Sequence, residues 1–373
     1  MILLLTVSLW SVENKFTIEN TNFTIEQASA FPALTDEASY LYNYDRLRLK
    51  DILTWNSFYL TAIADVVNYV GDDFVNSLDF KYIELLRADT PFDTRTNFYH
   101  YDSGTIYAKL HRFYAGYQDD HHNIIVGLQK ISMGVGRIWV PTDLYNPKNS
   151  FAREPDEVFP VLALTYAYSP SDLSVIRAIV SMRRDKTYKY ALSYKAFLDI
   201  ADFGLNVIYS DDTQMYGYEV EGDLFDTGAE WRSEGGYYIS KPLDSEFYQA
   251  ILGADYGFKN GITWTVEGYY SSETFTYEQI ILYFQNDIVN NMVQSNFYLG
   301  TSLTYDFNIA FNGSVMLIES FNEDNSLFIV PAITYTLNDN NILILSAMIN
   351  SGSDQSEFGR FGNTYFFNWK WSY

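Results

Sequence analysis

Gln214-Met-Tyr-Gly-Tyr-Glu-Val-Glu-Gly-Asp-Leu224 alternates between two kinds of side chain. Tyr216 and Tyr218 fall on one side of an extended chain, whereas Glu219 and Glu221 fall on the other. A period of two is typical of a β-strand with one apolar and one polar face. The stretch therefore predicts a strand that separates two different environments.

The same alternation recurs along the chain, and β-branched and aromatic residues favour it. Residues 276–294 remain unassigned, and no helical period longer than two turns is evident. Eighteen segments fit a strand: 23–31, 40–50, 56–69, 104–117, 122–132, 159–168, 173–183, 188–198, 202–210, 214–224, 228–237, 246–256, 262–272, 295–306, 308–319, 326–336, 341–350 and 364–373. The chain is predicted to be all-β.

Composition selects the architecture. Of 373 residues, 47% are hydrophobic, 18% are aromatic and only 19% are charged, with 33 Tyr. A soluble sandwich would bury Val, Ile and Leu rather than expose Tyr and Trp, and a propeller would repeat about every 40–50 residues. A membrane barrel faces lipid on one side, water on the other, and carries aromatic girdles. We therefore expect a transmembrane antiparallel up-and-down β-barrel.

Gap lengths test this expectation independently. Every long gap (70–103, 133–158, 273–294 and 351–363) falls at the same end of the predicted strands, and the gaps at the other end are short. Long extracellular loops and short periplasmic turns are typical of bacterial outer-membrane barrels, which have even strand numbers. The pattern predicts about 18 strands, or 16 if segment 23–31 and a neighbour fail.

Charge and cysteine content exclude several classes of protein. The chain has no Cys, which rules out disulfides, thiolate zinc sites, Fe–S clusters and a cysteine nucleophile. The formal net charge is −23, whereas a nucleic-acid-binding protein needs a basic surface to bind phosphates. We expect no nucleic-acid partner.

The two ends carry different signals. The apolar run Met1–Trp10 is too short for a spanning helix. Residues 1–11 are either a signal-peptide remnant or a buried N-terminal strand, and 12–373 are predicted to form a single outer-membrane barrel.

At the other end, Tyr365–Tyr373 alternates aromatic and polar residues and ends on an aromatic. It resembles the C-terminal signal read by the barrel-assembly machinery of Gram-negative bacteria.

One stretch carries a family resemblance. Gly134-Val-Gly-Arg-Ile-Trp-Val-Pro-Thr-Asp-Leu-Tyr-Asn-Pro147 follows Val126-Gly-Leu-Gln-Lys-Ile131. It resembles a porin-like family of outer-membrane barrels that carry G-x-G-R-x-W-x-P-T-D-L-x-N-P after a strand reading V-G-x-Q-x-I. The resemblance spans about Leu41 to Tyr373 and implies a barrel in the bacterial outer membrane. It does not name a substrate.

Loop 133–158 is rich in turn-forming residues, and we expect it to fold into the barrel lumen. There, Arg137, Asp143 and Arg153 would either pair with wall charges and narrow the pore or pin the loop to the wall. The expected inward-facing charges on the strands complete the predicted pore lining: Arg46, Arg48, Lys50, Arg177, Lys189, Lys195, Glu219, Glu221, Glu230, Arg232 and Glu234. They predict a cationic and an anionic arc.

No enzyme signature is present. His121 and His122 are adjacent in a predicted turn, and only His100 lies on a long loop, with Asp102 nearby. Real metal sites space their ligands, and no nucleophile motif or phosphate-binding loop appears. We predict no catalytic residues, no metal site and no cofactor.

These features predict an outer-membrane porin-like channel for passive or weakly selective diffusion of small hydrophilic solutes or ions. The alternative is a barrel sheath or scaffold for a partner such as an electron-transfer cytochrome. Expected partners are outer-membrane lipid and lipopolysaccharide, and a homo-oligomer is possible. The net charge predicts mild cation selectivity that weakens as salt rises.

Overall fold

The computed structural model describes residues 12–30, 39–147, 149–322 and 324–373. The signal-peptide remnant proposed at residues 1–11 lies outside them. No helix within the described ranges is long and apolar enough to cross a membrane.

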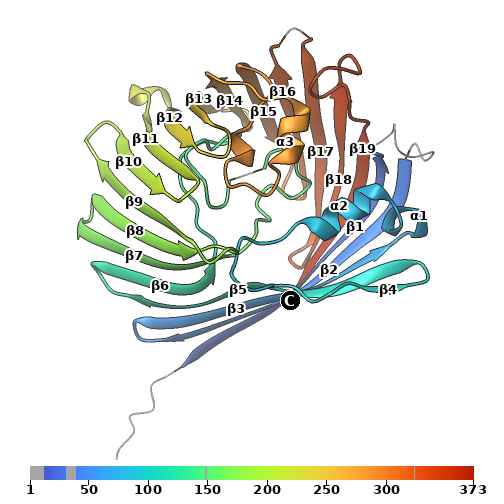
Figure 1. The fold of residues 1–373 in the computed structure, drawn as a ribbon, viewed down its shortest axis with the longest axis horizontal. Coiled ribbons are helices and arrows are strands. Elements are labelled where there is room, and N and C mark those ends of the chain that lie inside the picture. Colours follow the sequence, from blue (N-terminus) through green and yellow to red (C-terminus); the bar gives the residue numbers. More distant parts are fainter. Residues whose placement is uncertain (1–11, 31–38, 148, 323) are drawn as a thin grey trace, which may run out of the picture.

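The chain forms an antiparallel sheet that closes on itself (Figure 1). Of the nineteen strands among the described residues, three-residue β4 pairs with β5 alone, and the other eighteen form a ring closed by β1 and β19. The strands are β1 (Glu13–Ala28), β2 (Ser39–Trp55), β3 (Phe58–Val70), β4 (Tyr99–Tyr101), β5 (Gly104–Gln118), β6 (His122–Gln129), β7 (Val161–Ser171), β8 (Ser174–Met182), β9 (Tyr188–Phe197), β10 (Asp202–Tyr209), β11 (Thr213–Asp223), β12 (Ala229–Ser240), β13 (Ser245–Gly257), β14 (Ile262–Ser271), β15 (Phe297–Asp306), β16 (Phe311–Ser320), β17 (Ser326–Asn338), β18 (Asn341–Ser351) and β19 (Thr364–Ser372). The predicted all-β barrel of eighteen strands is confirmed.

Short helices occupy the connections. Ser77 caps α2 by accepting from the Phe80 N–H, and Thr276 forms a capping box with Gln279 at the start of α3. The helices are α1 (Asp72–Val75), α2 (Leu78–Leu85) and α3 (Tyr277–Leu282), with 3-10 turns η1 (Phe225–Thr227) and η2 (Val289–Asn291). The unassigned stretch 276–294 is therefore a loop with α3 and η2.

The first strand begins earlier than the predicted 23–31, because β1 pairs with β2 from Glu13 onward. The outward positions of this strand pair break the apolar pattern. Asn20 and Asn22 donate to Asp45 Oδ1 at 2.9 and 3.0 Å, and Asn22 also donates to Asn43. These polar side chains satisfy one another, so the alternation that marks a strand is lost there.

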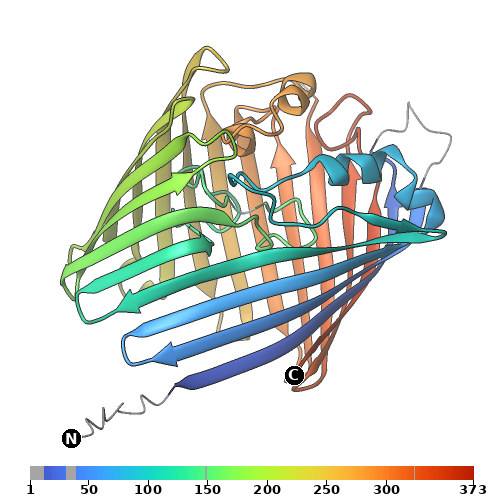
Figure 2. The same ribbon diagram turned by 60° about the horizontal axis from the view of Figure 1, so that its bottom comes forward.

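Connections of very different length lie at the two ends of the barrel (Figure 2). We call the end with the four longest ones, 71–103, 130–160, 272–296 and 352–363, the long-loop rim. The start of β1 and the end of β19 lie at the opposite end, the short-turn rim.

The outer face is apolar and the inner face is charged. On β11, Tyr216 and Tyr218 are 49% and 37% exposed, whereas Glu219 is 8% exposed. On β9, Tyr190 and Leu192 are likewise exposed. This is the reverse of a water-soluble protein, and a closed barrel with such an outer face is built to span a membrane.

The core lies inside the ring. One cluster joins the 130–160 and 272–296 connections to the inner walls through Met133, Leu144, Tyr238 and Ile288. A second cluster holds α1 and α2 against the long-loop rim, where the Phe74 and Tyr42 rings stack with centroids 3.6 Å apart. The lumen is therefore partly filled by the chain's own loops.

Candidate channel constriction

Residues 130–147 and 149–160, between β6 and β7, lie inside the ring of strands (Figure 1). We call them the lumen segment. Two glutamates on β12 and β14 bind its backbone on one side, and two arginines on β2 bind its side chains on another. The segment thus bridges separate arcs of the wall.

Glu234 on β12 holds the first part of the segment. Its Oε2 accepts from the N–H groups of Val135 and Gly136 at 2.7 and 3.0 Å. Its Oε1 accepts from the N–H and the hydroxyl of Thr142, both at 2.7 Å. Glu234 has no exposed surface, and both of its oxygens bind the lumen segment.

Glu267 on β14 does the same for the next residues. It accepts from the N–H groups of Arg137, Ile138 and Trp139 at 2.8 to 3.1 Å, and it is fully buried. Charge-assisted bonds of this kind are stronger than those between neutral groups. The two carboxylates therefore fix residues 135–142 by their backbone.

Two glycines make this contact possible. Gly134 has φ +80°, and a Cβ there would lie 2.4 and 2.5 Å from the Glu234 carboxylate oxygens. On β15, a Cβ at Gly300 would lie 2.9 Å from the Trp139 ring. Glycine is thus required where the segment turns and where its tryptophan packs on the wall.

Asp143 binds the segment itself. It accepts from the N–H groups of Met133, Tyr145 and Asn146 at 2.9 to 3.1 Å. Burial raises the pKa of Asp143 to about 6 despite these donors. These hydrogen bonds are all within the lumen segment, so they fold the segment on itself rather than joining it to the wall.

Arg137 and Arg232 share one cluster of carboxylates. Arg137, half exposed, lies 2.8 Å from Glu221, 3.3 Å from Asp255 and 3.6 Å from Glu230. Arg232 is fully buried and contacts Asp255 and Glu221. The structure thus brings together four residues of the predicted pore lining, and adds Asp255.

Glu154 and Glu157 anchor the segment to the opposite arc. Arg46 donates to both oxygens of Glu154 at 2.9 Å. Arg48 donates to Glu157 at 2.7 and 3.0 Å and to Asp65 on β3 at 2.7 and 2.8 Å. The Arg48 and Arg46 guanidinium groups hold the pKa of Glu157 below its usual range although burial acts in the opposite direction.

Asp65, His111 and Glu157 form a group with metal-ligand geometry, their donor atoms lying within 4.8 Å of one another. The same carboxylates already bind cations. Asp65 lies 3.3 Å from Lys109 and 2.7 Å from Arg48. The negative charge that would hold a metal ion is therefore neutralised by the wall.

The other predicted lysines and arginines contact separate groups. Lys189 donates to the Leu144 carbonyl at 2.8 Å and lies 3.1 Å from Asp287. The remaining contacts are Arg177 to the Ser132 carbonyl at 3.2 Å, Arg153 to Gln27 Oε1 at 3.1 Å and Lys195 to Asp202 at 3.7 Å. Lys50 is half-buried on β2 and makes no ion pair within the described chain.

Three cavities border the lumen segment. We name them the Arg183 cavity (about 520 Å³), the Arg177 cavity (about 420 Å³) and the Lys109 cavity (about 210 Å³). The charged residues of the Arg183 cavity are Arg87, Arg183, Arg184 and Lys189 with Asp89, Glu157 and Asp287. Those of the Arg177 cavity are Lys130, Arg177 and Lys195 with Glu219. Those of the Lys109 cavity are Arg46, Arg87, Arg95, Lys109 and Arg184 with Asp93, Glu154 and Glu157. In each, cations outnumber anions.

Several contributors were absent from the predicted pore lining: Asp65, Lys109, His111, Glu154, Glu157, Asp255 and Asp287. Lys109 and His111 alternate with apolar residues on β5, a signal that could have placed them inward. Asp255 occupies a comparable position on β13. The partners of the loop residues depend on how the lumen segment crosses the barrel, which alternation does not reveal.

No family model matches the chain, and no curated protein is similar to it in sequence. Solved structures share its architecture. OccAB4 of Acinetobacter baumannii superposes with a TM-score of 0.60 at 13% identity, covering 97% of this chain and 98% of that one. A BenF-like porin from Pseudomonas fluorescens gives 0.61 at 10%, covering 96% and 98%. OpdK of Pseudomonas aeruginosa, solved with vanillate, gives 0.56 at 9%, covering 97% and 98%.

The fold is that of an outer-membrane porin. At these identities the likeness concerns the fold, and it agrees with the apolar outer face in placing the barrel in a bacterial outer membrane. The contacts of the lumen segment described above are those of this chain and are not taken from the similar barrels.

Proposed function

We propose that the protein is a passive outer-membrane channel for small hydrophilic solutes. The observation that carries the proposal is the arrangement of the interior. A closed barrel with an apolar exterior holds a charged lumen segment, and cavities with charged linings border that segment. Polar cavities in a membrane barrel suit the passage of hydrophilic solutes rather than lipid.

We further propose a preference for small anionic solutes. The sequence predicted mild cation selectivity from the net charge, but the lumen glutamates Glu234 and Glu267 are occupied by backbone donors. Ion pairs with Arg137 and Arg232 offset the negative charges of Glu221 and Glu230. Cations outnumber anions around all three cavities, which supports anion preference. The similar barrel OpdK was solved with vanillate, an organic anion.

We propose that Tyr365–Tyr373 is read by the barrel-assembly machinery, which its exposed aromatic residues on β19 support. Outer-membrane lipid and lipopolysaccharide would cover the outer face. The hydrogen-bonded polar side chains on β1 and β2 are the outward face we favour for a homo-oligomer contact.

The alternative of a sheath for an electron-transfer cytochrome has less support. A sheath needs an open bore wide enough for a protein, whereas the lumen segment is bonded to two arcs of the wall. Removing it would break the buried pairs of Arg46 and Arg48.

A proteoliposome swelling assay tests the proposal. Liposomes containing the protein are expected to swell in isosmotic arabinose and to remain unchanged in a dextran too large for the cavities. Protein-free liposomes provide the control. Equal behaviour of liposomes with and without the protein would refute a channel.

A further inference from the structure

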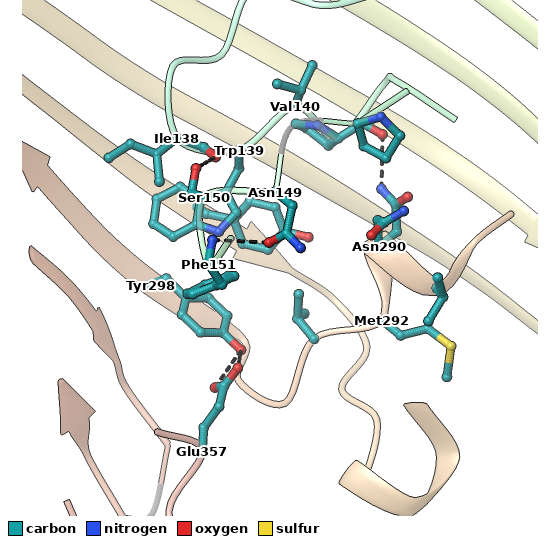
Figure 3. Close-up of a pocket in the computed structure, with 16 residues that line it drawn as sticks. Ile138, Trp139, Val140, Asn149, Ser150, Phe151, Asn290, Met292, Tyr298 and Glu357 are labelled. Carbon is teal, nitrogen blue, oxygen red and sulfur yellow. Dashed lines mark hydrogen bonds between the residues drawn. The ribbon is translucent and has the colours of Figure 1, made fainter. Parts of the chain in front are cut away.

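A fourth cavity, of about 230 Å³, lies where three loops meet the inner wall of β14 and β15 (Figure 3). The lumen segment contributes Trp139 and Phe151, the 272–296 connection contributes Asn290, and the 352–363 connection contributes Glu357. Asn149, Asn290 and Phe151 are exposed and mark its open side. At about 30 Å³ per water molecule, the cavity has room for roughly eight waters.

Aromatic rings form most of one wall. The ring centroids of Trp139, Tyr269 and Tyr298 form a triangle with sides of 5.5, 6.0 and 5.8 Å. Trp139 is fixed against Gly300, and Tyr269 and Tyr298 are buried. Faces of tryptophan and tyrosine attract cations through their quadrupoles, more strongly when water is excluded.

Glu357 supplies a carboxylate at the same place. Tyr298 donates to it at 2.7 and 3.0 Å, and Ser320 donates at 2.7 Å. Among the described residues, no basic group lies within ion-pair distance of Glu357. Burial raises the pKa of Glu357, although Arg360 acts in the opposite direction. Glu357 is thus a largely buried acid without a bonded cation, in contrast to Asp65, which is ion-paired, and Glu234, which binds several peptide donors.

We propose that this cavity binds a small organic ammonium cation, held by the Glu357 carboxylate and the Trp139–Tyr269–Tyr298 rings. A quaternary or methylated ammonium group satisfies both features at once, because its charge meets the carboxylate and its methyl groups meet the rings. An anion would be repelled by Glu357, and a hydrated metal ion would gain little from the rings. The cavity shares Pro147, Asn149, Val289 and Asn290 with the lining of the Arg183 cavity, but none of the charged residues of that lining.

Calorimetric titration of the purified full-length protein in detergent tests this directly. Tetramethylammonium chloride is the probe, and sodium chloride at equal ionic strength is the reference. We expect saturable binding of tetramethylammonium that Glu357→Gln weakens at least tenfold and Trp139→Leu weakens at least threefold. Asp354→Asn removes the same charge from the same loop outside the cavity, so it should leave binding unchanged.

Retained heat-modifiable migration in gels checks that each variant is folded. Binding should also weaken as the pH is lowered, because a protonated Glu357 carries no charge to attract the cation. Absence of saturable heat, equal binding of sodium, or equal binding by Glu357→Gln would overturn the proposal. Because the assay does not depend on conductance, its result is independent of whether the barrel is a channel.

Discussion

Glu234 Oε1 accepts both the backbone N–H and the hydroxyl of Thr142, each at 2.7 Å. Its other oxygen accepts from Val135 and Gly136. A single wall carboxylate therefore binds two separate turns of the lumen segment. The position of the segment depends on backbone donors in addition to ion pairs, so neutralising this one side chain should release it.

Glu234→Gln is expected to loosen the lumen segment. The amide keeps one acceptor oxygen, but its NH2 group faces peptide N–H donors and cannot accept from them. Each lost bond to a charged group contributes about 1.5–3 kcal/mol. The urea-unfolding free energy should fall by about 2 kcal/mol or more, and the mean single-channel current should rise. Glu230→Gln is the control, because Glu230 is exposed and holds no backbone group in the described chain. Equal effects of the two substitutions would contradict the role assigned to Glu234.

The barrel itself could be predicted from sequence because lipid and water impose opposite demands on alternate residues. The alternation of the aromatic Tyr216 and Tyr218 with the charged Glu219 is enough to assign the outer and inner faces of β11. The start of β1 could not be predicted, because Asn20 and Asn22 face outward and satisfy Asp45 across the strand pair.

The site could be predicted only in part, for a different physical reason. Inward direction is a local property, and Arg46, Arg48 and Glu234 all face inward as expected. Their partners are set by the path of the lumen segment across the barrel. Arg46 meets Glu154, 108 positions away, and Glu234 meets Val135, 99 positions away. The alternation of polar and apolar residues within one strand carries no information about contacts between residues so far apart in the sequence.

Arg48 should contribute far more to stability than its neighbour Lys50. Arg48→Met leaves Asp65 buried with only Lys109 as an ion partner and removes one of the two arginines that pair with Glu157. Breaking a buried pair in this way costs about 3–5 kcal/mol, measured as the change in unfolding free energy. Lys50→Met, two residues along β2, removes the same charge without breaking an ion pair. We expect a change below about 0.5 kcal/mol for it, and comparable losses for both would refute the anchoring role.

Asp143 should make stability depend on pH in a narrow window. Its pKa is raised to about 6 in the folded protein from 3.8, so the folded state holds this proton more tightly than the unfolded state. Its stabilising contribution is therefore fully present below about pH 4 and is lost as pH rises through 6. The difference in unfolding free energy between the protein and Asp143→Asn should change between pH 4 and pH 7. A difference that stays constant over this range would be inconsistent with a raised pKa.

Ion selectivity should follow the linings of the cavities. In a potassium chloride gradient at low salt, the reversal potential is expected to indicate a preference for chloride. Arg87 and Arg184 line both the Arg183 and the Lys109 cavities, so Arg87→Gln with Arg184→Gln should shift the potential toward cations. Glu219→Gln should shift it the other way, because Glu219 is the acidic residue of the Arg177 cavity. A clear cation preference of the unaltered protein would contradict this assignment.

Single-channel recording in planar bilayers tests the central claim most directly. The purified protein alone should produce discrete conductance steps, and Glu234→Gln should produce larger and less uniform ones, because the lumen segment is no longer held at Thr142. Correctly folded protein that inserts without producing any steps would contradict a channel. Steps of the same size in both proteins would show that the lumen segment does not form the constriction.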